Sequence, residues 1–126
     1  MMELHAGLVG KATVTVVEAN TAAVMKSGAL PVFATPAMCA LMEEAACAAI
    51  ASCLPEGEGS VGISLAISHD KPTALGQTVT ATATLVNVEG RKLTFTVEAA
   101  DEKGTIGKGS HQRFLINNAK FMSKLG

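Results

Sequence analysis

The stretch from Pro36 to Cys53, PAMCALMEEAACAAIASC, determines how the rest of this chain has to be arranged. It has the composition of one helix, about 27 Å long at about 1.5 Å per residue. Its side chains are apolar on nearly every face, and a helix without a polar face is normally buried. Glu43 and Glu44 interrupt it, and a buried carboxylate is costly unless it has a partner or a chemical task. We therefore expect an enclosed helix, with one of the two acids directed to a functional site.

The flanking residues predict where this helix begins and ends. Thr35 has the hydroxyl of an N-cap residue, and Pro36 suits the first helical position. Pro55 and the glycines after it end the helix. A bilayer requires about 20 apolar residues, so this shorter, acidic segment is not expected to span a membrane. The first residues show no basic region followed by an apolar run, so we expect a cytoplasmic protein without a leader peptide.

Alternating segments follow the helix and predict strands. In residues 61–67 large apolar side chains alternate with glycine, serine and alanine, and His69 keeps the parity of the apolar face. Residues 78–85, 91–99 and 105–116 also alternate, with turn residues between them. Val61, Ile63, Leu65 and Ile67 are expected on one face, toward the helix.

The order of these elements predicts the fold. Residues 11–17 form one strand before the helix, residues 20–28 a short helical turn, and four strands joined largely by hairpins come after it. This gives a single α+β domain over residues 1–126, with a curved antiparallel sheet around one helix. The hot-dog fold has this architecture. The core would be built from small residues, and such a thin core gains stability by oligomerising, so we expect a homodimer or tetramer.

Composition excludes several classes of function. The net charge of −1 and the absence of Trp and Tyr argue against nucleic-acid binding. Cys39, Cys47 and Cys53 lie on the apolar helix without metal-ligand spacing, so we expect reduced, buried thiols and no metal. No phosphate-binding loop, dinucleotide fingerprint or serine-hydrolase motif is present, and no cofactor is expected.

Thr35 is the first candidate site residue, because it stands at the helix N-terminus. It either caps the helix only, or also belongs to a site in which free amides polarise a carbonyl group. Pro36 has no N–H, so those amides would be the ones of Ala37 or Met38.

Other polar residues leave alternatives open. Glu43 and Glu44 lie about 100° apart on the helix, so they face different surroundings, and the pattern does not decide between them. His69 is either a hydrogen-bonded core residue or a site residue, whereas His5 and His111, the latter beside Arg113, have weaker claims.

A basic edge is a further candidate for substrate binding. Arg91 and Lys92 are adjacent, and either remain solvated or hold phosphate groups. We count Arg91 and Arg113 among the residues that would contact substrate.

Four runs in order carry a family resemblance: VFATPAMCALMEEAA, VGISLAISHDKPTALGQTVTATATL, EGRKLTFTVEAAD and IGKGSHQRF. Over residues 31–121 the chain resembles the fluoroacetyl-CoA thioesterase-like family of hot-dog proteins. The resemblance implies a catalytic Thr, Glu and His, which fall on Thr35, Glu43 and His69. It leaves Glu44 structural or exposed, and it places Gly62 near the thioester carbonyl.

The function implied is hydrolysis of an acyl-CoA thioester to a carboxylate and CoA. Glu43 would act as nucleophile or general base, His69 would hold Glu43 or protonate the thiolate, and Thr35 would orient water and carbonyl. Thr35 and Glu43 lie about 12 Å apart along the helix, so the site is expected near a dimer interface or spanning the pocket.

Substrate and reaction class have alternatives. The family carries aromatic residues before VFAT, but this chain has SGALP, which favours a general short-chain acyl group over fluorine selectivity. A hot-dog enoyl-CoA hydratase or dehydratase is a second reading, disfavoured by the order of the three residues. A non-catalytic acyl-CoA-binding module is a third, against which an intact polar trio weighs.

Overall fold

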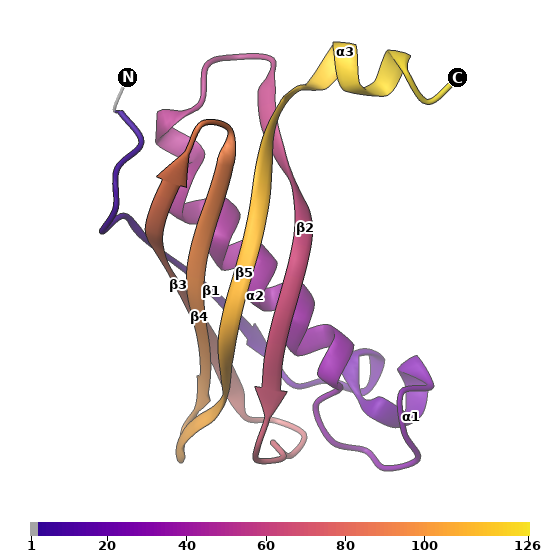
Figure 1. The fold of residues 1–126 in the computed structure, drawn as a ribbon. Coiled ribbons are helices and arrows are strands. Elements are labelled where there is room, and N and C mark those ends of the chain that lie inside the picture. The colour runs from indigo at the N-terminus through magenta and orange to yellow at the C-terminus, as the bar shows by residue number, and fades with distance from the viewer. Residues whose placement is uncertain (1–2) are drawn as a thin grey trace.

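A computed structural model describes residues 3–126. Its elements, in chain order, are β1 (Val9–Thr15), η1 (Glu18–Asn20), α1 (Ala22–Met25), α2 (Thr35–Ile50), η2 (Ala51–Cys53), β2 (Glu58–His69), β3 (Thr78–Glu89), β4 (Lys92–Asp101), β5 (Gly104–Asn117) and α3 (Asn118–Ser123). The sheet has five strands in the order β1-β3-β4-β5-β2, and every neighbouring pair is antiparallel. Figure 1 shows α2 running obliquely across one face of this sheet. The predicted α+β hot-dog architecture is confirmed.

The core lies between α2 and the inward side of the central strands. Gly10 of β1 lies so close to α2 that an added Cβ would overlap the backbone of Ala45 and Ala49, so the small residue permits this packing. The expected alternation in β3 and β4 is confirmed over residues 78–85 and 92–99, where every second residue is buried. The inward residues include Met42, Ile50, Val79, Ala81, Ala83, Leu85, Leu93 and Phe95.

Strand β2 departs from the expected alternation. Its pairing with β5 shifts register between Gly62 and Ser64, which is the signature of a β-bulge. Leu65 packs against the core after the bulge, whereas Ile63, the inserted residue of the bulge, is 51% exposed. The prediction that residues 61, 63, 65 and 67 share one face is therefore wrong, because one inserted residue reverses the parity. His69 keeps the inward parity that was predicted.

Helix α2 is only partly enclosed. One side packs on the sheet, but Ala40, Glu44, Cys47 and Ala48 are exposed. Cys47 was expected to be buried and is exposed, because it lies on the side of the helix that faces away from the sheet. Helix α2 and η2 together are long and apolar enough to cross a membrane. This is weak evidence for a membrane span, because the core helices of soluble proteins have the same length and apolarity.

The segment before α2 and the C-terminal helix α3 lie outside the helix and sheet described above. The segment before α2 lies over the body of the protein through isolated bridges from Thr21 to Phe33 and from Val32 to Ala74. The C-terminal helix α3 was not predicted. Asn117 precedes it as the N-cap residue, and the side chain of Asn117 accepts a hydrogen bond from the Lys120 amide at 3.0 Å.

Candidate active site

The start of α2 differs from the prediction in a way that matters for the site. Ala34, in an extended conformation, occupies the N-cap position, and Thr35 is the first helical residue. The Met38 amide donates to the Ala34 carbonyl at 3.0 Å, so it is not available to a ligand. Thr35 does not cap the helix. Its hydroxyl is instead 2.7 Å from Nδ1 of His69.

His69 ends β2 and faces the N-terminus of α2. Its Nδ1 is paired with Thr35, and its buried Nε2 has no hydrogen-bond partner within residues 3–126. Burial lowers the pKa of His69, while the Asp70 carboxylate and the Lys71 backbone act in the opposite direction. The imidazole is therefore mainly neutral near pH 7, and one of its two nitrogens carries a lone pair that can accept a proton.

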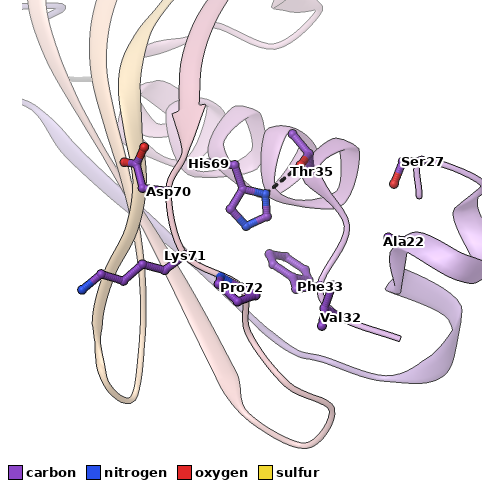
Figure 2. A pocket seen from close by; sticks show the side chains of 9 residues that line it. All are labelled: Ala22, Ser27, Val32, Phe33, Thr35, His69, Asp70, Lys71 and Pro72. Carbon is purple, nitrogen blue, oxygen red and sulfur yellow. Dashed lines mark hydrogen bonds between the residues drawn. The ribbon is translucent and has the colours of Figure 1, made fainter. Parts of the chain in front are cut away.

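A hollow of about 270 Å³ surrounds this pair, at the end of the sheet next to α1. Figure 2 shows the imidazole beside Thr35 and close to the ring of Phe33. The lining residues are Ala22, Ser27, Val32, Phe33, Thr35, His69, Asp70, Lys71 and Pro72. The hollow therefore places a hydroxyl and a histidine beside a small, partly apolar space.

Glu43 lies elsewhere along α2. Its Oε2 accepts a hydrogen bond from Nη1 of Arg113 at 3.2 Å and is 4.0 Å from Nε2 of His111, and the side chain is 43% exposed. The neighbouring Glu44 is exposed, as expected. Within one chain the predicted trio thus separates into a Thr35–His69 pair and a Glu43 group.

Arg113 is the centre of the Glu43 group. It is buried, and its guanidinium donates from Nε to the Ser60 hydroxyl at 2.8 Å and from Nη2 to the Ser60 carbonyl at 3.0 Å. Nη1 is within 3.2 Å of both Glu43 and Nε2 of His111. A buried guanidinium needs its donors satisfied, and this arrangement uses all three nitrogens.

His111 supports Arg113 from the core. Its Nδ1 is 2.8 Å from the Ser64 carbonyl, which can only accept, so Nδ1 carries the proton and Nε2 accepts from Arg113. Burial lowers the pKa of His111, and Arg113 adds to this, while the bond to Ser64 and the charge of Glu43 act against it. The ring stacks on Phe95 with centroids 6.0 Å apart.

Gly62 shapes the position of the carboxylate. It pairs with Arg113 across the β2–β5 ladder, and a Cβ at this position would lie 2.5 Å from Oε2 of Glu43. No side chain larger than hydrogen fits beside the carboxylate as it stands. The sequence placed Gly62 near the thioester carbonyl, which stays a prediction; its proximity to the Glu43 carboxylate is a finding of the structure.

The two groups are well separated in one chain. Gly62 and His69 are seven residues apart on β2, roughly 23 Å at about 3.3 Å per residue. Thr35 and Glu43 are about 12 Å apart on α2. One thioester carbonyl cannot contact Glu43 and His69 of the same chain at once.

The remaining candidates have different locations. Arg91 lies on the outer face with its guanidinium 5.5 Å from the Phe114 ring centroid, away from the Glu43 group. Ala37 is half-buried in the first turn of α2, where amides commonly lack partners. Among residues 3–126 no group of three or more His, Cys, Asp or Glu is arranged to hold a metal ion.

From the sequence, His111 had only a weak claim to be a site residue, and Ser60 had none. The available signal was parity, since His111 and Arg113 are polar residues two apart on a strand whose inward positions are otherwise apolar. Two inward polar residues require each other or a third partner, which here is Glu43.

Comparison with known proteins relates the chain to others by sequence. A family model described as fluoroacetyl-CoA-specific thioesterase matches residues 16–119. The fluoroacetyl-CoA thioesterase of Streptantibioticus cattleyicolor is 46% identical over 94 residues, which are 75% of this chain and 68% of that protein.

Solved structures agree with the sequence match. A structure of the fluoroacetyl-CoA thioesterase FlK superposes with a TM-score of 0.92 at 35% identity, covering 98% of this chain and 96% of that one. A Thermus thermophilus protein described as a thioesterase superfamily member superposes with a TM-score of 0.90 at 28% identity, covering 99% and 93%.

Proposed function

Because the chain belongs to the fluoroacetyl-CoA-specific thioesterase family, it is an acyl-CoA thioester hydrolase, and we propose that two copies of it share each active site. The observation that supports this most directly is the separation of Glu43 from the Thr35–His69 pair. Each chain supplies half of a site that neither half can complete alone.

The free edge of β2 supports a specific dimer. Within residues 3–126 this twelve-residue strand pairs with β5 on one side alone, and an unprotected edge of that length favours pairing with another strand. Antiparallel pairing of two β2 strands about a two-fold axis near residues 65 and 66 brings Gly62 opposite His69 of the partner subunit. The Glu43 group would then face the partner's Thr35 and the partner's His69.

The exposed side of α2 supports the same arrangement. Ala40, Cys47 and Ala48 present small apolar side chains to solvent in the single chain. A second copy that continues the sheet through β2 would also bring a second α2 toward this surface. Small residues allow such helices to approach closely.

Hydrolysis at this site follows from the groups present. Glu43, held by Arg113, acts either as a general base that takes a proton from the attacking water or as a nucleophile that forms an anhydride then opened by water. Thr35 and the first-turn amide of Ala37 stabilise the oxyanion, and the C–S bond breaks. In the general-base route the proton that Glu43 takes from water passes through the partner's neutral His69 to the thiolate, which leaves as CoA. In the nucleophile route CoA leaves as the thiolate and is protonated by solvent, and the partner's His69 takes a proton from the water that opens the anhydride.

The substrate is proposed to be a general short-chain acyl-CoA. The segment over the Thr35–His69 hollow carries Ala29 and Leu30 but no aromatic side chain, and Leu30 is 65% exposed. FlK was solved as a variant in complex with fluoroacetate and CoA. Without an aromatic lid, this chain has no evident element that would recognise one fluorine.

We also propose a cytoplasmic location, since three free thiols suit a reducing compartment.

A mixing experiment tests the shared site. Glu43→Gln and His69→Ala chains are co-expressed with different tags, and hydrolysis of acetyl-CoA is followed by thiol release. If the site is shared, half of the dimers are mixed and each has one intact site, so activity should recover to about one quarter of wild type. No recovery in purified mixed dimers would assign each site to a single chain.

A panel of acyl-CoA substrates tests the reaction itself. Thiol release from short saturated acyl-CoA supports hydrolysis. Addition of water to a trans-2-enoyl-CoA without thiol release would favour the hydratase, and tight binding without any turnover would favour the binding module.

A further inference from the structure

The outer face of the sheet carries a groove of about 430 Å³ between β2, the end of β5 and α3. We propose that this groove binds the adenosine 3′-phosphate 5′-diphosphate end of the CoA ester, an inference that rests on the proposed function and specifies its substrate contacts. The lining residues are Val61, Ile63, Arg91, Phe114, Leu115, Ile116, Asn117, Lys120, Phe121 and Lys124.

The distribution of aromatic residues points to this groove. The chain has only four phenylalanines and no Trp or Tyr. Phe33 and Phe95 are buried in the core, and both remaining rings, Phe114 and Phe121, line the groove. An adenine ring binds by stacking on an aromatic side chain, because every base has a π-face. The two phenylalanine rings that are not buried in the core therefore lie in one place.

The charges of the groove match a nucleotide. Arg91, Lys120 and Lys124 line it, and no Asp or Glu does, although the whole chain has a net charge of −1. Within the described part of the chain, none of these three cations forms an ion pair. Glu58 lies nearby and lines a smaller adjoining hollow together with Arg91. Phosphates are the anions that a cluster of Arg and Lys recognises best.

The groove is held in shape by local contacts. Arg91 lies over the Phe114 ring at 5.5 Å, and its carbonyl accepts a hydrogen bond from the Leu115 amide at 2.8 Å. The Asn118 amide donates to the Gly57 carbonyl at 2.9 Å and so ties the start of α3 to the chain just before β2. These contacts fix Arg91 against the Phe114 ring and the start of α3 against the chain before β2.

The position of the groove fits a long substrate. The bulge at Gly62 and Ser64 turns Val61 and Ile63 to the outer face, whereas Gly62 borders Glu43 on the inner face. In the proposed dimer the residues of β2 before Gly62 extend beyond the paired stretch. The pantetheine arm can pass over that unpaired edge, from the groove to the Glu43 group.

Truncated substrates test the proposal. Acetyl-CoA and the acetyl thioester of N-acetylcysteamine share the reacting group, but only the first has the nucleotide. For Lys120→Ala/Lys124→Ala, the ratio of kcat/KM for the CoA ester to that for the truncated ester should fall roughly 10- to 100-fold, mostly through KM. The matched control is Lys11→Ala/Lys103→Ala, which removes two exposed lysines outside the groove and should leave the ratio unchanged.

Direct binding separates this proposal from the thioesterase assignment. Adenosine 3′,5′-bisphosphate should bind the wild-type protein in calorimetric titration, should bind Lys120→Ala/Lys124→Ala at least tenfold more weakly, and should inhibit only hydrolysis of the CoA ester. If the lysine variant changes neither the ratio of the two kcat/KM values nor the affinity for adenosine 3′,5′-bisphosphate, the groove does not bind the nucleotide, and the thioesterase function is unaffected. If neither ester is hydrolysed, the proposed function fails, and the titration still decides whether the groove binds the nucleotide. A change of oligomeric state in the lysine variant would reassign the groove to a subunit contact.

Discussion

Nη1 of Arg113 lies 3.2 Å from Oε2 of Glu43, so a buried cation of β5 holds the carboxylate of α2 beside the β2 strand. The same guanidinium is fixed by Ser60 and His111. This network gives the carboxylate one orientation and leaves part of it accessible to substrate. It also explains how a helix that is apolar on most faces accommodates an acid at this position.

The adjacent acids provide a matched pair for testing the role of Glu43. Glu43→Gln keeps the shape of the side chain but removes the charge that can accept a proton or attack a carbonyl. We expect kcat/KM for acetyl-CoA hydrolysis to fall by about 10²–10⁴. Glu44→Gln makes the same chemical change on the exposed neighbour and should have wild-type kinetics. Equal effects of the two substitutions would contradict the assignment.

The Arg113 network predicts a coupled loss of stability and activity. Arg113→Met removes the partner of Glu43 and leaves the half-buried Ser60 carbonyl and the buried His111 Nε2 without this donor. Each such group costs about 1–3 kcal/mol. We therefore expect a lower free energy of unfolding in urea, together with a lower kcat.

Arg113→Lys separates charge from geometry. A lysine keeps the positive charge but cannot reproduce the planar fork that reaches three partners. We expect this variant to recover less than half of the lost stability. Full recovery of stability and kcat would mean that only charge matters here.

Features of the fold and site that depend on residues close together in the sequence could be predicted, whereas features that depend on distant residues could not. The helix and strands were predictable because local periodicity and turn residues determine them, and the resemblance singled out Thr35, Glu43 and His69. The bulge at Gly62 was not predictable, because it depends on register with β5 and has no distinct sequence signal. The inserted residue, Ile63, points outward and so lines the groove as well.

The separation of Glu43 from His69 lies beyond what spacing in one chain can show. The number of residues between Thr35 and Glu43 on α2 already showed that the two are too far apart to contact one carbonyl. Only the contacts of Arg113 show which residues surround Glu43 instead. Thr35 was similarly ambiguous. A hydroxyl before a proline is typical of an N-cap, and only the tertiary contact with His69 reveals that Ala34 takes that position.

Thr35 should therefore matter for activity and little for stability. Thr35→Val replaces the hydroxyl by a methyl group of similar size, and we expect kcat to fall by about 10- to 100-fold. Thr35→Ser keeps the hydroxyl and should retain most activity. Because Thr35 does not cap α2, both variants should melt within a few degrees of wild type. A loss of about 1 kcal/mol of stability in Thr35→Val but not in Thr35→Ser would indicate a capping role after all.

The two inward histidines predict an acid-labile fold. The pKa values of His69 and His111 are lowered by burial from the ordinary value of 6.5, so the unfolded chain binds more protons than the folded chain just below that pH. Stability should thus be full above about pH 6.5 and fall as the pH decreases through the lowered pKa values. Urea unfolding between pH 5 and 8 measures this.

The His111 contribution to that slope can be isolated. His111→Gln replaces the ring by an amide that does not titrate, so stability at pH 7.5 should fall while the dependence on pH becomes shallower. An unchanged slope between pH 5 and 6.5 would assign the acid sensitivity to other groups.

Gly62 offers the most local test of the Glu43 geometry. Gly62→Ala adds one Cβ that would lie 2.5 Å from Oε2 of Glu43 and 3.2 Å from Cε1 of His111. The carboxylate can move because part of it faces solvent, so the fold should persist while Glu43 leaves its position beside Arg113. We expect kcat to fall at least tenfold with a small change in melting temperature, whereas KM should change little. Combining Gly62→Ala with Glu43→Gln should add almost nothing to the loss caused by Glu43→Gln alone, because both act on one carboxylate. Fully additive losses would show that Gly62 acts on the reaction by a route independent of Glu43.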